Sequence, residues 1–262
     1  MVSVSYRFML AGVILLIYSR ARGLNMHFRL KDHGFMVLLG FLLFGINYWL
    51  VYYAELSLPS GLVAIVFSSI IFLNIINGAW LLKSPIRGYV VLGAAIGMTG
   101  IFLVFKEEVD KFDLADGNTI AFLLAFLGAI SASLGNITSA FMQKISKMPV
   151  IQTNAFAMLY GSILMLIIAL VAGKPLAFVF SFAYISSLLY LTIFGSIVAF
   201  GCYLTLLGRI GADKAAYATL VIPVIAIILS TIFEDYHWNT YAAAGVILIL
   251  TGNFIVLQKR YR

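Results

Sequence analysis

The sequence predicts an all-α polytopic membrane protein with nine membrane-spanning helices and an internal repeat. Of its 262 residues, 63% are hydrophobic and only 10% are charged, and the mean hydropathy is +1.07. A soluble globular domain is about half apolar and a quarter charged. The chain also contains several apolar runs of about the 20 residues that a helix needs to cross a bilayer, and one glycine pattern that occurs twice.

Each apolar run is predicted to be a helix, because backbone polar groups in lipid must find their hydrogen-bond partners within their own segment. The connections between the runs are short and carry nearly all of the charged residues, so no soluble domain is expected. In chain order the predicted helices are 2–18, 34–54, 60–82, 88–105, 118–142, 150–172, 182–207, 213–233 and 240–257.

The charged residues divide between the two sides of these helices. Eight of the ten acids fall on one side, and thirteen of the seventeen basic residues fall on the other. The thirteen are Arg20, Arg22, Arg29, Lys31, Lys83, Arg87, Lys144, Lys147, Arg209, Lys214, Lys259, Arg260 and Arg262. Basic residues mark the cytoplasmic face of a membrane protein. We therefore expect a multi-pass protein of the cytoplasmic (inner) membrane with a cytoplasmic C-terminus, and nine crossings then place the N-terminus outside.

The repeat is visible in two segments that follow the pattern G-x5-T-G-x-F, at residues 93–102 and 245–254. At the same offset of 152 residues, Ala64 matches Ala216; at an offset of 149, Gly12 matches Gly161. We interpret residues 1–110 as a first repeat of four helices and residues 111–262 as a second repeat of five. An odd number of helices per repeat inverts one copy relative to the other, which is the design of many secondary transporters. Gly93 and Gly97 have the spacing that lets membrane helices approach closely.

Three stretches carry a resemblance to a known family: SYRFMLAGVILLI, LPSGLVAIVFSSIIFLNIINGAWLLKSPI and TIFEDYHWNTYAAAGVILILTGNFIVL. They resemble the EamA-type transporters of the drug/metabolite transporter superfamily. The resemblance implies ten helices in two inverted five-helix repeats, both termini in the cytoplasm, and a central cavity. This chain departs from that pattern in lacking the first helix, and in reading Lys83-Ser84-Pro85 where such transporters usually have an acid. We expect that the natural first helix is missing from this sequence; the alternative is a nine-helix protein whose cavity is open along one side.

Polar side chains within the apolar runs are the candidates for a substrate cavity. An amide that faced lipid would be costly, so each of these groups is expected to face protein or a wet cavity. The candidates are Asn47, Tyr48, Tyr52, Ser68, Asn74, Asn77, Asn136, Tyr203 and Tyr217. Hydrogen bonding between helices is the alternative role for the asparagines, and an interfacial aromatic belt is the alternative for Tyr52.

Two charged residues are candidates for coupling or charge pairing. Arg7 is the one basic residue inside an apolar run, and ionisable groups within a membrane are functional candidates by default. Snorkelling to the interface, or pairing with an acid there, is its alternative role. Glu55 could take up protons or hold a cationic substrate, or it could be a solvated acid in an outer loop.

Enzyme, metal and nucleic-acid functions are not indicated. The chain has no H-E-x-x-H zinc motif, no phosphate loop and no serine elbow. Its single cysteine, Cys202, cannot form a disulfide within the chain, and its three histidines fall in loops on opposite sides. We expect no cofactor, no metal and no nucleic-acid partner; the oligomeric state is open, with a homodimer as one option. The net charge of +7 is explained by membrane orientation.

The function predicted from the sequence is secondary transport of a small organic metabolite, such as an amino acid, through the cytoplasmic membrane. Export by alternating access around a central cavity is the expected mode, and proton coupling and facilitated diffusion both stay open. The alternative is a membrane protein that does not transport, such as a scaffold or a lipid-modifying enzyme.

Overall fold

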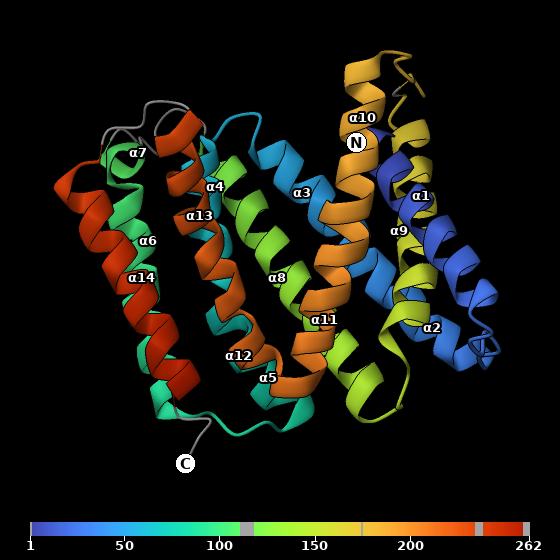
Figure 1. The fold of residues 1–262 in the computed structure, drawn as a ribbon, viewed down its shortest axis with the longest axis horizontal. Coiled ribbons are helices and arrows are strands. Elements are labelled where there is room, and N and C mark those ends of the chain that lie inside the picture. Colours follow the sequence, from blue (N-terminus) through green and yellow to red (C-terminus); the bar gives the residue numbers. More distant parts are fainter. Residues whose placement is uncertain (1, 111–117, 174, 234–237, 259–262) are drawn as a thin grey trace. The chain divides into compact units, whose positions relative to one another are not determined.

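The computed structural model describes residues 2–110, 118–173, 175–233 and 238–258, and nearly all of them are helical (Figure 1). The elements are α1 (Val2–Ala21), α2 (Leu30–Leu39), the π-helical segment η1 (Gly40–Ile46), α3 (Asn47–Ala54), α4 (Ser60–Ser68), α5 (Ile70–Leu82), α6 (Gly88–Val104), α7 (Lys106–Asp110), α8 (Asn118–Lys144), α9 (Val150–Val171), α10 (Phe182–Thr192), the π-helical segment η3 (Ile193–Val198), α11 (Ala199–Ile210), α12 (Ala212–Ala215), α13 (Tyr217–Phe233) and α14 (Thr240–Gln258). Each of the nine ranges predicted from the sequence coincides with one or more of these helices to within a few residues at its ends.

The lengths of the helices suit a membrane. Within the described residues, seven continuous helical stretches are long and apolar enough to cross a bilayer, and 88–104 and 240–256 are shorter apolar helices. The predicted class, an all-α polytopic membrane protein, is therefore confirmed. The count of nine crossings and the inverted repeats remain predictions.

The second helix begins at Leu30, four residues before the predicted start at Gly34. Charged residues here suggested a loop, but one of them caps the helix: Asp32 Oδ2 accepts a hydrogen bond from the backbone N–H of Arg29 at 3.1 Å. An acidic side chain in the first turn satisfies a free N–H group and interacts favourably with the helix dipole. The charged segment is thus the start of the helix and not part of the loop.

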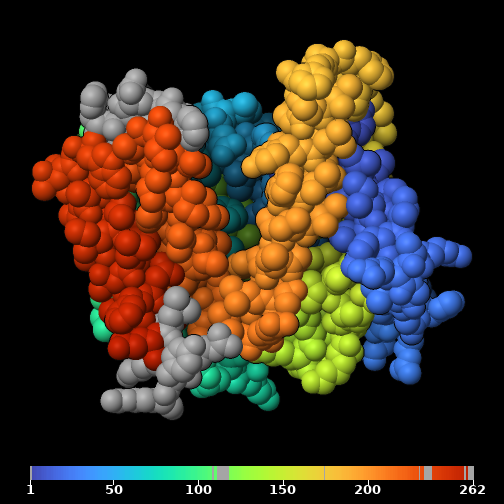
Figure 2. Space-filling model, viewed as in Figure 1, coloured from blue at the N-terminus to red at the C-terminus, as the bar shows by residue number. Residues whose placement is uncertain are grey.

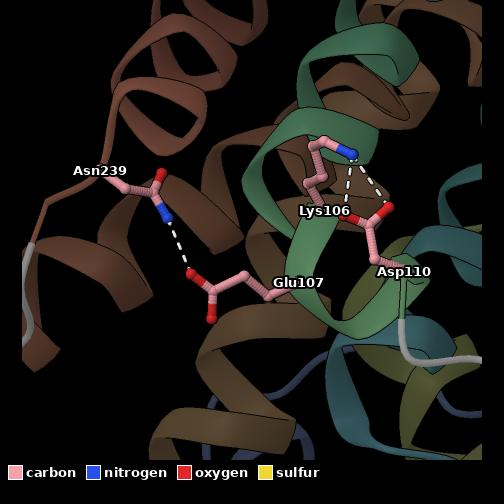
Figure 3. Close-up of polar contacts among 4 residues, drawn as sticks. All are labelled: Lys106, Glu107, Asp110 and Asn239. Atoms are coloured by element: carbon pink, nitrogen blue, oxygen red, sulfur yellow. Dashed lines mark hydrogen bonds and ion pairs between the residues drawn. The ribbon is translucent and has the colours of Figure 1, made fainter.

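The sequence did not predict α7, a single turn that follows α6. Lys106 donates to Asp110, one turn further on, at 2.8 Å, and such an i,i+4 pair favours the helical conformation. Asn239, just before α14, donates from Nδ2 to Glu107 Oε1 at 3.0 Å (Figure 3). Its Oδ1 also accepts from the backbone N–H of Ala242 at 2.7 Å and so caps α14. One side chain therefore ties α7 to the start of α14.

Two of the long helices contain a π-helical segment at matching positions. In η1 the segment includes Phe44-Gly45, and in η3 it includes Phe194-Gly195, 150 residues later. A π-helical turn replaces the usual i→i+4 hydrogen bonds with wider ones, and such turns occur frequently at functional sites. The shared position adds a structural feature to the repeat inferred from sequence.

The described chain divides into two compact units, one formed by residues 1–52 and 134–210 and the other by 53–133 and 211–262. Each unit draws on both of the repeats proposed from the sequence, 1–110 and 111–262. These repeat boundaries stay a prediction, since a sequence repeat and a compact unit need not coincide.

In the first unit, α1 and α9 lie side by side, and η1 packs against α9 (Figure 1). Glycines allow the close approach. A Cβ added to Gly12 would lie 2.9 Å from the carbonyl oxygen of Ala155, and one added to Gly161 would lie 2.6 Å from that of Gly40. The continuous helix from α10 to α11 is mostly exposed, with Phe182 90% accessible, and Figure 2 shows it uncovered in gold and orange. An apolar helix face of this kind suits contact with lipid.

In the second unit, the two copies of G-x5-T-G-x-F form the contact between α6 and α14 (Figure 1). A Cβ on Gly252 would lie 2.6 Å from the carbonyl oxygen of Gly93, and a Cβ on Gly100 would lie 2.6 Å from that of Gly245. The first glycine of each copy thus faces the last glycine of the other. The duplicated pattern is explained by a reciprocal, antiparallel crossing in which both helices need small residues at the same two points.

Candidate functional site

A cluster around Arg7 is the most unusual polar feature of the first unit. Arg7 is the sixth residue of α1, about 8 Å along the helix from its first residue. Its Nε donates to Ser196 Oγ at 2.7 Å, and its Nη2 donates to the carbonyl oxygen of Gly195 at 2.9 Å. Both acceptors belong to η3. The guanidinium also lies 5.1 Å from the ring centroid of Phe8 and 5.7 Å from that of Tyr48.

Arg7 forms no ion pair with any acid in the described residues, where the two ion pairs are Arg87–Asp213 and Lys106–Asp110. Its partners are a hydroxyl, a carbonyl and two aromatic rings, and all of them are neutral. A charged side chain within a membrane span is costly unless it is paired or hydrated. A planar guanidinium prefers a carboxylate, which it can bind through two parallel hydrogen bonds. The arrangement can therefore recognise a carboxylate group.

A second polar group of the same unit joins α8 to α11. Asn136, 1% exposed, donates from Nδ2 to the hydroxyl of Tyr203 at 2.9 Å. Gln143, two turns along α8, donates to Ser139 Oγ at 3.1 Å and to the carbonyl oxygen of Leu204 at 2.9 Å. The Oδ1 atom of Asn136 is buried without a partner in the structure. A buried amide oxygen without a partner costs about 1–3 kcal/mol, so a ligand or water that bonds it would bind favourably.

The second unit holds a comparable set on α5 and α8. Asn74 is fully buried and donates from Nδ2 to the carbonyl oxygen of Ala212 at 3.1 Å, while its Oδ1 has no partner in the structure. Asn77 donates to Ser133 Oγ at 2.9 Å. Ser68, at the end of α4, is buried and bonds its own helix through the carbonyl oxygen of Ile65. Both asparagines thus make the bonds between helical segments that were their alternative role, and one of them keeps a free acceptor.

Tyr217 occupies a different position from the other candidates. It is 1% exposed and donates its hydroxyl to the carbonyl oxygen of Val90, so that it ties α13 to α6. Because the hydroxyl is already used within the protein, Tyr217 is better suited to helix packing than to a place in a substrate cavity.

The remaining candidates lie on and just after α3. Asn47 is buried, whereas Tyr52 is 43% exposed. Glu55 follows the last residue of the membrane-length stretch 30–54 and is exposed. Partial burial nevertheless raises the pKa of the Glu55 carboxyl above its ordinary value. The exposed position fits a solvated acid, and the raised pKa favours proton uptake; the coupling role stays a prediction.

Sequence reasoning missed three residues of the first unit: Ser196, Gln143 and Asn154. Ser196 and Asn154 are polar residues inside apolar runs, which is the signal that selected the other candidates, whereas Gln143 follows the predicted end of its helix at residue 142. Ser196 follows the Phe194-Gly195 pair that recurs from Phe44-Gly45, so the repeat itself could have indicated it.

The chain matches a known protein family along most of its length. Residues 1–106 and 119–258 match the sequence profile of the EamA-like transporter family. The chain belongs to the EamA-like transporter family. The expected resemblance to EamA-type transporters is thereby confirmed.

Relatives in this family share about a quarter of their residues with the chain. The "Uncharacterized inner membrane transporter YedA" of Escherichia coli (strain K12) is 27% identical over 97% of this chain and 82% of its own length. A "Probable amino-acid metabolite efflux pump" of the same strain is 25% identical over 79% of this chain and 70% of its own length. A solved crystal structure at 18% identity covers 100% of this chain and 88% of its own, with a TM-score of 0.80, and shows the same fold. The chain is thus a multi-pass membrane protein of a transporter family.

Proposed function

We propose that the chain is a secondary transporter that exports a small organic metabolite with a carboxylate group, such as an amino acid. Membership of the EamA-like transporter family supports transport, and one relative is named as a probable amino-acid metabolite efflux pump. The observation that carries the proposal is Arg7: a cation within a membrane-length helix, bonded only to neutral groups of the described protein. A substrate carboxylate would supply the missing negative charge.

The proposed mode is alternating access around a central cavity, with the two sequence repeats, 1–110 and 111–262, moving against each other. We propose Tyr48, Asn136 and Tyr203 as substrate contacts of the first unit and Asn74 as a substrate contact of the second, together with the other candidates except Tyr217. The free Oδ1 atoms of Asn74 and Asn136 supply acceptors for a substrate ammonium or amide. We propose the π-helical segments η1 and η3 as the points at which the long helices bend.

Transport by the purified protein in lipid vesicles tests this proposal. We expect radiolabelled amino acids to cross the membrane of such vesicles faster than that of vesicles without protein, for at least one amino acid of a full panel. A flux equal to that of empty vesicles for every amino acid, with a gradient imposed, would contradict the proposed substrate class. If the protein also gave no flux of other organic acids, the non-transporting alternative would be favoured.

The proposed topology has a separate test. A fluorescent protein that matures only in the cytoplasm should be bright when fused after Arg262. The same reporter inserted in the loop 106–117 should be dark, because this loop contains five acids and two lysines and is predicted to lie outside. Residues 106–110 of this loop form α7, and 111–117 lie outside the described residues. Brightness in the loop would overturn the proposed orientation, and alkaline phosphatase, which is active only outside, gives the opposite readout as a control.

A further inference from the structure

The first unit contains a pocket that does not include the Arg7 cluster. It lies between α1, α9 and the helix formed by η3 and α11, and its volume is about 660 Å³. Ile14, Tyr18, Asn154, Gly201 and Arg209 are among its lining residues. Every lining residue belongs to the same compact unit.

The pocket is polar at one end and apolar along its length. Tyr18 lies three residues before the end of α1, Asn154 four residues after the start of α9, and Arg209 one residue before the end of α11. The polar groups therefore gather where these helices end, at the side that the charge pattern marks as cytoplasmic. Further from that end, Ile14 and Val198 line the pocket, and a Cβ added to Gly201 would meet nothing within 4 Å.

Two of the polar groups lack a partner in the described protein. Asn154 is only 2% exposed, yet its Oδ1 is buried without a hydrogen bond. Arg209 is exposed and forms no ion pair among the described residues. The side-chain amide of Asn154 can flip and present its NH2 group where its oxygen now lies. Asn154 can therefore bond either a donor or an acceptor. An occupant should therefore be anionic at the helix end, polar one turn deeper, and apolar beyond that.

We propose that this pocket binds one anionic phospholipid from the cytoplasmic leaflet. The phosphate pairs with Arg209, a glycerol ester carbonyl accepts from the Asn154 amide, and an acyl chain lies in the open space beside Gly201. Basic pockets between transmembrane helices on the cytoplasmic side bind anionic headgroups in this way. The neighbouring surface is apolar, with Ile17 64% exposed and Val198 48% exposed, which suits a pocket that opens toward lipid.

Cys202 gives a direct test in the unaltered protein, because it lines the pocket, is exposed, and is the single cysteine of the chain. In delipidated protein held in detergent micelles, N-ethylmaleimide should alkylate Cys202. Dioleoyl phosphatidylglycerol should slow this reaction several-fold by covering the thiol, since cysteine reactivity depends on access. Dioleoyl phosphatidylcholine at equal concentration should leave the rate unchanged. Equal protection by both lipids, or by neither, overturns the proposal.

Variants test separately the phosphate contact at Arg209 and the acyl-chain space beside Gly201. Arg209→Gln should weaken phosphatidylglycerol protection of Cys202 by about tenfold in lipid concentration, the size expected for one hydrogen bond to a charged group. Arg20→Gln, which removes a charge at the end of α1 outside the pocket lining, should have no effect. Gly201→Leu fills the open space and should abolish lipid retention, whereas Gly201→Ala adds one carbon and should preserve it.

Native mass spectrometry of the same samples identifies the occupant. The wild-type chain should appear with one retained phosphatidylglycerol, and Arg209→Gln and Gly201→Leu should appear without it. A wild-type protein that appears without phosphatidylglycerol, whether as one chain or as two, would refute the lipid site. As a folding control, the melting temperature of each variant is measured without lipid. A loss of lipid binding is accepted only where the variant melts as a folded protein.

Discussion

Replacing Gly245 with leucine is expected to force α6 and α14 apart and to destabilise the protein severely. A Cβ at this position would lie 2.5 Å from the carbonyl oxygen of Gly100 and 2.9 Å from the backbone nitrogen of Val104. Both atoms belong to the backbone of α6, so no side-chain rotation can relieve the clash and the helices must separate. Overpacking that side chains can absorb costs about 1–3 kcal/mol. We expect a larger loss for Gly245→Leu, seen in detergent as a collapse of the melting temperature or of the yield of folded protein.

Gly201→Leu is the matched control for this variant, because it makes the same change on a membrane helix at a position with open space around it. With both proteins delipidated, its melting temperature should stay close to that of the wild-type protein, because a bound lipid would stabilise only the wild type. Gly100→Leu should reproduce the effect of Gly245→Leu, since the two glycines face each other across the same crossing. If Gly245→Leu melts like Gly201→Leu, then α6 and α14 do not pack through these glycines.

The sequence predicted most of the fold because each helix carries its own signal. Lipid requires every backbone polar group to bond within its segment, so an apolar run of sufficient length has one structural solution. The glycine pattern also predicted a close helix contact correctly. It did not show that Gly93 and Gly100 would face Gly252 and Gly245, because partner choice depends on how distant segments pack.

The sequence did not predict the start of α2, the π-helical segments or the partners of Arg7, because the sequence features that determine them are weak or lie far apart in the chain. The start of α2 was placed late because Lys31 and Asp32 look like loop residues, although an acid in a first turn stabilises a helix. The π-helical segments have no recognised sequence pattern, and hydropathy alone cannot distinguish them from an ordinary α-helix. Arg7 was selected for its charge inside an apolar run, but its partners Gly195 and Ser196 lie almost 190 residues away and no spacing rule connects them.

The Arg7 cluster leads to the second large expected effect, on transport. Arg7→Gln should lower the affinity for a carboxylate substrate by about 10- to 100-fold, because a hydrogen bond to a charged group contributes about 1.5–3 kcal/mol. The glutamine can still bond Ser196 or the Gly195 carbonyl, so the contact between α1 and η3 is largely kept. Arg7→Lys keeps the charge but loses the planar pair of donors, and should give an intermediate result. Initial rates in vesicles, measured against substrate concentration for whichever amino acid the wild-type protein transports, give KM and kcat separately.

A structural role for Arg7 would also reduce transport, and the decarboxylated amine of the same amino acid separates the two explanations. If Arg7 binds the carboxylate, the amine should inhibit transport weakly, and to the same degree, in the wild type and in Arg7→Gln. The amine has no carboxylate, so it cannot make the contact with Arg7 in either protein. The amino acid itself should compete far better on the wild type than on the variant. Ser196→Ala removes one acceptor of Arg7 without touching the charge, so it should change KM by much less than Arg7→Gln. A loss confined to kcat, with equal KM for wild type and Arg7→Gln, would place Arg7 in the helix contact alone and remove the carboxylate from the proposed substrate.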